Sequence, residues 1–259
     1  MKMLGRVSVE PGSSRIRPFW RGHLFLFDRP KPASRSSQSS YKLLAVFLFL
    51  EVMVRPIFRI AAPRLGMASR PWWLLLEMSL LTALTCWLVV RFARVRLSDL
   101  GLYSWRRWSQ TERLYFPQIL AISVAVFSFF SWPELKALAS RHDVWQILLF
   151  VCVPHIIWGF YQELLYRGIL QAELVRRWGA ALGILVSNLI FTFGPLHAYH
   201  FAWMRTNPSH LWIFAAIFAI GMFFAILFER SGNLFMVGIL HGVGDWFIDG
   251  LAMVSRMAR

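Results

Sequence analysis

Three short stretches of the sequence place ionisable or amide side chains within apolar runs. They are Gln162, Glu163 and Arg167 in GFYQELLYRGIL, His197 in FTFGPLHAYH, and His241 with Asp245 in GILHGVGDW. An ionisable group at bilayer depth costs roughly 2.5 to 3.5 kcal/mol on insertion scales. A chain that keeps several such groups in apolar segments therefore indicates a functional site.

Two of these stretches pair side chains that are one helical turn apart. Glu163 and Arg167 are related as i and i+4, and so are His241 and Asp245, so each pair shares one helix face. If the helices converge, the site holds a carboxylate beside a guanidinium, two imidazoles and a second acid. That set is sufficient to activate a water molecule and to stabilise an oxyanion.

The same side chains leave a metal site open. Two histidines and one carboxylate are the ligands of many hydrolytic zinc sites, which makes Glu163, His197 and His241 the candidates for a divalent metal such as zinc. No HExxH pair occurs, so the spacing alone does not decide between a metal-bound water and a water activated by a carboxylate. The sequence demands no other cofactor.

The composition predicts an integral membrane protein. Of the 259 residues, 57% are hydrophobic and 16% are charged, and the mean hydropathy is +0.51. The net charge of +15 comes from basic residues that lie between the apolar runs. That distribution indicates that the basic loops contact the anionic lipids of the cytoplasmic leaflet, and it does not favour nucleic acid as a partner. Cys86 and Cys152 lie in apolar segments, which argues against a disulfide scaffold.

The chain divides into a basic tail, residues 1–41, which we predict to be disordered, and a single helical membrane domain, residues 42–259. The predicted fold is an all-α bundle of about seven to eight transmembrane helices. The apolar runs lie at about 43–62, 71–91, 114–132, 144–162, 180–197, 211–228 and 234–254. In the first run Glu51, Arg55 and Arg59 share one face, which should meet protein or water. The positive-inside rule places the N-terminus in the cytoplasm, and the predicted location is a prokaryotic inner membrane.

The order and spacing of these residues resemble the CPBP family, the intramembrane proteases that include CAAX prenyl endopeptidases and bacteriocin-processing or immunity proteins. Its motifs are Glu-Glu-x-x-x-Arg, Phe-x-x-x-His and His-x-x-x-Asn/Asp on successive helices. They correspond here to Gln162 to Arg167, Phe193 to His197 and His241 to Asp245, within a similar region of about 90–252.

The resemblance implies an intramembrane endopeptidase that hydrolyses a peptide bond in a membrane peptide or lipidated protein at the bilayer. It implies that the first glutamate of the pair and His197 activate the water. It also implies that His241 and Asp245 hold the oxyanion, although an ionised Asp245 cannot donate a hydrogen bond and would instead orient His241. For a shared site, the fourth helix must continue past Arg167 toward Arg176, so that Glu163 lies within the membrane.

Gln162 is the departure from the family pattern, because an amide can orient a water but cannot accept its proton. The base is then Glu163, His197 alone, or absent. This leaves a second interpretation, a non-catalytic immunity or scaffold protein that binds a membrane peptide in the same cavity. A transporter is a third, disfavoured because the first and last spans do not mirror each other.

Overall fold

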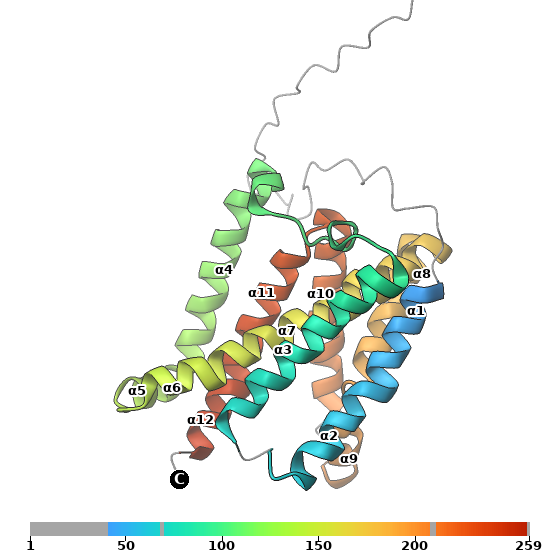
Figure 1. Ribbon diagram of the computed structural model, residues 1–259. Coiled ribbons are helices and arrows are strands. Elements are labelled where there is room, and N and C mark those ends of the chain that lie inside the picture. The colour runs from blue at the N-terminus through green and yellow to red at the C-terminus, as the bar shows by residue number, and fades with distance from the viewer. Residues whose placement is uncertain (1–40, 68–69, 208–210, 258–259) are drawn as a thin grey trace, which may run out of the picture.

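The computed structural model describes residues 41–67, 70–207 and 211–257, and its regular structure over these residues is entirely helical (Figure 1). The predicted all-α class is therefore confirmed. The predicted basic tail lies outside the described residues except for Tyr41, which begins the first helix.

The α-helices are α1 (Tyr41–Leu48), α2 (Arg55–Arg64), α3 (Pro71–Leu88), α4 (Gln110–Phe130), α5 (Trp132–Ala139), α6 (Val144–Ile147), α7 (Val153–Glu163), α8 (Ala172–Phe193), α9 (Tyr199–Thr206), α10 (Leu211–Ser231), α11 (Leu234–Asp245) and α12 (Leu251–Met257). π-Helical segments continue several of them: η2 (Phe49–Val54), η3 (Val89–Ala93), η6 (Leu148–Cys152), η7 (Leu164–Gln171) and η9 (Trp246–Gly250). Two short 3₁₀ turns, η4 (Leu97–Leu100) and η5 (Trp105–Arg107), lie between α3 and α4.

Five helical segments among the described residues are long and apolar enough to cross a membrane. They are Trp72–Ala93, Gln110–Phe130, Val144–Phe193, Leu211–Ser231 and Leu234–Arg256. This supports the predicted integral membrane protein, whereas the predicted count of seven to eight spans is not reproduced. The predicted runs 144–162 and 180–197 both fall largely within the segment Val144–Phe193, and a non-helical Gly179 separates them.

The first predicted run, 43–62, is helical as α1, η2 and α2 but is not among the five segments. Its polar face is buried: Arg55 Nη2 donates to Glu51 Oε2 at 2.6 Å, and the two side chains are 3% and 1% exposed. The ion pair follows from their i and i+4 spacing. Glu51 and Arg55 therefore face protein, as the sequence predicts, whereas Arg59 is exposed and lines a cavity.

The long segment Val144–Phe193 runs through α6, η6, α7, η7 and α8. It passes Arg167 without a break, which confirms that the helix continues toward Arg176. The helix is interrupted only later, at Gly179, where φ is 79° and ψ is 169°, a non-helical conformation that favours glycine. Glu163 therefore lies inside a helix and not at its end.

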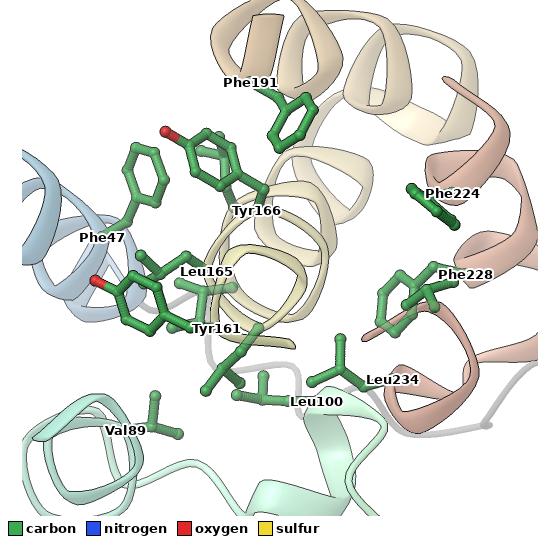
Figure 2. Packing of buried hydrophobic residues seen from close by; sticks show 14 of the residues in the cluster. Phe47, Val89, Leu100, Tyr161, Leu165, Tyr166, Phe191, Phe224, Phe228 and Leu234 are labelled. Atoms are coloured by element: carbon green, nitrogen blue, oxygen red, sulfur yellow. The ribbon is translucent and has the colours of Figure 1, made fainter. Parts of the chain in front are cut away.

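The middle of this segment is the centre of the bundle. Tyr161, Leu165 and Tyr166 have no exposed surface, and Figure 2 shows other helices around them, with Phe47 from α1 and Phe191 from α8. The Tyr166 ring meets both phenylalanines edge to face, with centroid separations of 5.2 Å in each case. Dense packing holds η7 in one position, and the polar side chains on it are correspondingly fixed.

Helices α7 and α11 cross in backbone contact beside the predicted site residues. A Cβ atom at Gly159 would overlap the backbone of Gly242, and one at Gly242 would overlap the backbone of Ile156. Small residues permit such close approach between helices in a bilayer. The crossing therefore brings the turn that holds Gln162 and Glu163 against the turn that begins at His241.

Candidate functional site

A cavity of about 880 Å³ lies among α2, α3, α4, α7, α10 and α11, with part of its lining from α9 and the loop before it. Four of the six predicted site residues line it: Gln162, His197, His241 and Asp245. The three motif stretches therefore do converge, although they come from positions up to 83 residues apart. Glu163 and Arg167 are not among the lining residues.

Glu163 lies behind the cavity with both carboxylate oxygens in use. Its Oε1 accepts a hydrogen bond from Nδ1 of His241 at 2.7 Å, and its Oε2 accepts one from Nε of Arg167 at 3.1 Å. The Glu163 and Arg167 side chains are 0% exposed. This carboxylate is thus placed to hold His241 and Arg167 in position, and it does not face the space that a substrate would enter.

Asn188 completes the surroundings of Arg167. Arg167 Nη2 donates to Asn188 Oδ1 at 3.4 Å, and Asn188 Nδ2 donates to the carbonyl of Phe218 at 2.9 Å. The guanidinium also stacks over Phe191, with its carbon 4.7 Å from the ring centroid. Sequence reasoning missed Asn188, although a polar amide within the apolar stretch LVSNLIF was a visible signal.

Gln162 and Asp245 meet across the helix crossing. Gln162 Nε2 donates to Asp245 Oδ2 at 3.0 Å. The other carboxylate oxygen, Oδ1, lies 3.5 Å from His241 Nε2, and the Asp245 side chain is 15% exposed. Of the two carboxylates in the predicted site, Asp245 lines the cavity and Glu163 does not.

The hydrogen bonds of His241 define its protonation. Because a carboxylate only accepts, Nδ1 carries the proton shared with Glu163. Without a proton, Nε2 of His241 would point its lone pair at the ionised carboxylate of Asp245, and the two groups would repel. An attractive contact over the 3.5 Å between Nε2 and Asp245 Oδ1 therefore requires a proton on Nε2. The site therefore holds a proton between His241 and Asp245.

His197 occupies the loop between α8 and α9, outside the membrane-spanning segments. Its Nδ1 lies 2.7 Å from the carbonyl of Phe191, so Nδ1 donates and Nε2 is the acceptor of the ring. Burial, with smaller contributions from the charges of His200, His241 and Arg55, lowers the pKa of His197 to about 4. The imidazole is therefore neutral at neutral pH, as a base must be.

Sequence reasoning did not place several further polar residues in the cavity. They are Arg55, Arg59, Glu77, Ser123, His155, Tyr199, His200 and Asp249. Each interrupts or adjoins an apolar run, which is the available signal. Arg55 and Arg59 were noted as polar helix-face residues, but nothing in the sequence connected them with His197.

The ranges 41–67, 70–207 and 211–257 contain no group of three or more His, Cys, Asp or Glu side chains arranged to hold a metal ion. Glu163 uses both oxygens on other partners, and His241 uses Nδ1 on Glu163. The candidate ligands Glu163, His197 and His241 thus do not fit a shared metal in this arrangement. We derive no chemical step through one.

Comparison with known proteins adds a family and distant relatives. The family described as type II CAAX prenyl endopeptidase Rce1-like matches residues 143–247, which include all six predicted site residues. Lysostaphin resistance protein A from two strains of Staphylococcus epidermidis is 27% identical over 186 residues, or 62% of this chain and 48% of that protein. The chain thus spans about half the length of the curated relatives it matches. No solved structure matches significantly.

Proposed function

Residues 143–247 belong to the CPBP family, and from this premise we propose that the chain is an intramembrane endopeptidase. It hydrolyses a peptide bond in a membrane-associated or lipid-linked peptide by means of an activated water. The cavity, which reaches from the loop at His197 to the helix crossing at Asp245, receives the peptide.

The hydrogen bond from Gln162 to Asp245 carries this proposal. The family pattern has a glutamate at the first position and asparagine or aspartate at the third. Here the first is an amide and the third a carboxylate, so the pair still contains one donor and one acid, with the two roles exchanged. Asp245 is then the general base, because it reaches the cavity while Glu163 is enclosed.

The reaction begins with a water held by His197 Nε2 and the Asp245 carboxylate. Asp245 takes a proton as the water oxygen bonds to the scissile carbonyl carbon. The second N–H of Gln162 and the Nε2 proton of His241 stabilise the oxyanion that forms. At 3.5 Å, the His241 to Asp245 contact is longer than a strong charge-assisted hydrogen bond, so this proton can turn to the oxyanion. When the C–N bond breaks, Asp245 returns its proton to the departing amine.

Glu163 and Arg167 have a supporting role in this mechanism. Glu163 fixes the ring of His241 through Nδ1 and balances the charge of the imidazolium. Arg167 in turn holds Glu163 in place. This arrangement resembles the way a buried carboxylate orients a catalytic histidine in hydrolases.

The test is hydrolysis by the full chain in proteoliposomes. Apolar peptides with a lipid-linked or membrane-spanning end are incubated in water enriched in ¹⁸O, and the products are weighed by mass spectrometry. We expect new carboxyl ends that carry ¹⁸O for wild type and none for Asp245→Ala. Peptides that remain intact with wild type, under conditions where they bind, would contradict the proposal.

A second function is favoured by Gln162 and by the name of the relatives, which describes resistance. In this case the chain is a non-catalytic immunity or scaffold protein that binds a membrane peptide in the cavity. It predicts binding without turnover. Gln162→Glu would then add a base at the position where the family carries one, and a gain of hydrolysis in that variant alone would favour this second function.

A further inference from the structure

The cavity contains a buried cation that the proposed reaction does not use. Arg55, on α2, lines the cavity although only 3% of its surface is exposed. We propose that Arg55 is a carboxylate-binding subsite that holds an acidic group of the bound peptide. The inference rests on the proposed function, in that the cavity must receive a peptide.

The hydrogen-bonding state of Arg55 is incomplete. Nη2 donates to Glu51 Oε2 at 2.6 Å. Neither Nε nor Nη1 of Arg55 has a hydrogen-bond partner among the described residues, and neither does Oε1 of Glu51. A buried charged donor left without an acceptor costs free energy. Since a guanidinium only donates, the missing partner must be an acceptor.

The charges around Arg55 come from three elements. Glu51 lies one turn before it, Arg59 lies one turn after it, and Glu77 lines the cavity from α3. The Arg59 guanidinium lies over the ring of Tyr199, at 5.6 Å from its centroid. Glu51 engages one nitrogen of Arg55, so the planar guanidinium still has donors for a second carboxylate, the group whose geometry it matches best.

The position of Arg55 relates the subsite to the reaction. Arg55 and His197 line the same cavity, and the charge of Arg55 makes a small contribution, after burial and the charges of His200 and His241, to the lowered pKa of that imidazole. A carboxylate bound at Arg55 would therefore occupy the same cavity as the centre that activates the water. It would fix the distance between an acidic group of the peptide and the bond that is cleaved, and it would partly offset the charge felt by His197.

Arg55 also lies outside the segment 143–247 that matches the family. The residues proposed for catalysis belong to that segment, whereas the carboxylate subsite belongs to α2, nearer the start of the chain. The structure thus assigns chemistry to one part of the chain and selection of the peptide to another.

The test measures binding, without cleavage. Dansyl-Leu-Leu-Leu with a free terminal carboxylate and the same peptide as its amide are titrated with purified full chain in detergent, and dansyl fluorescence gives each Kd. Dansyl-Leu-Asp-Leu amide reports an acidic side chain in place of the terminus. We expect at least one carboxylate peptide to bind wild type tenfold or more tightly than the neutral amide.

The variant Glu51→Gln/Arg55→Met removes both charges of the pair and leaves no buried charge unpaired. It should bind the acid and the amide equally. Arg141→Met/Asp143→Asn removes both charges of an ion pair away from the cavity. This control should retain the preference of wild type.

Equal binding of acids and amide by wild type overturns the subsite without any variant. A preference that survives in Glu51→Gln/Arg55→Met also overturns it. If that variant does not fold, Arg55→Lys serves, because loss of the planar fork should reduce the preference severalfold, and an unchanged preference would contradict the assignment. Absence of cleavage would count against the proposed function alone, since these titrations do not depend on turnover.

Discussion

The side-chain amide of Gln162 donates to the carboxylate of Asp245 at 3.0 Å, across the crossing of α7 and α11. The two residues are 83 positions apart in the sequence. They meet because α7 and α11 touch at Gly159 and Gly242, each about one helical turn before them. The hydrogen bond joins Gln162, at the position where the family pattern has a glutamate, to Asp245, the carboxylate that this chain has instead.

The buried pair of Glu163 and Arg167 should be essential for folding. Removal of one partner leaves a buried charge without compensation, which costs about 3 to 5 kcal/mol. We therefore expect Arg167→Met to lower the free energy of unfolding by that amount. The measurement is the thermal or denaturant midpoint of the protein in detergent.

The exposed pair of Arg141 and Asp143 is the control for this experiment. Its side chains are 25% and 39% exposed, so water compensates for either partner when the other is removed. Asp143→Asn should unfold at the midpoint of wild type. Equal midpoints for Arg167→Met and wild type would show that the buried pair contributes nothing to stability.

The helix crossing predicts a sharp difference between two glycines of α11. Gly242→Ala places a methyl group against the backbone of Ile156, so α7 and α11 must separate. At Gly244 the nearest atom to an added Cβ is 3.8 Å away, in the ring of Phe127. We expect Gly242→Ala to lower the thermal midpoint and Gly244→Ala to leave it unchanged or raise it slightly. Similar losses in both variants would argue against the close crossing.

His197 predicts a pH dependence of stability. In the folded chain the pKa of His197 is lowered to about 4 by burial, whereas in the unfolded chain it is near 6.5. Between these values the unfolded state binds a proton that the folded state does not. Stability should therefore fall as the pH is lowered from about 6.5 toward 4, by at most about 1.4 kcal/mol per pH unit from this group.

The comparison of variants isolates this histidine. His197→Gln should show a smaller loss of stability than wild type over that pH range, measured as the midpoint of unfolding at each pH. His142 is exposed in the folded chain, so His142→Gln should follow wild type. If His197→Gln and wild type lose stability in parallel, the imidazole is already protonated in the folded protein.

The sequence predicted the helical fold class because that class follows from local rules. Apolar runs of about 20 residues specify helices in a membrane, and ionisable groups within such runs must face protein or a cavity. The continuation of the helix beyond Arg167 was also predictable, since the family motif required Glu163 to be inside. The structure has this continuation.

Other features depended on contacts that a sequence does not show. The number of spans differs in part because the first run, 43–62, folds as α1, η2 and α2 and is not among the five segments. The runs 144–162 and 180–197 also fall largely within the one segment Val144–Phe193, which Gly179 divides. The positions of Glu163 and Asp245 relative to the cavity depend on helix rotation at the glycine crossing. No local pattern gives that angle, so the sequence could not tell which acid faces the cavity.

The exchange of acid and amide between positions 162 and 245 gives the most direct test of the proposed mechanism. Cleavage of one membrane-linked peptide is followed in proteoliposomes for wild type, Asp245→Asn and Gln162→Glu/Asp245→Asn. The account predicts that Asp245→Asn loses at least about a hundredfold in rate, the usual scale of a general base, and that the double variant regains hydrolysis. Asp245→Asn that cleaves at the rate of wild type would contradict it.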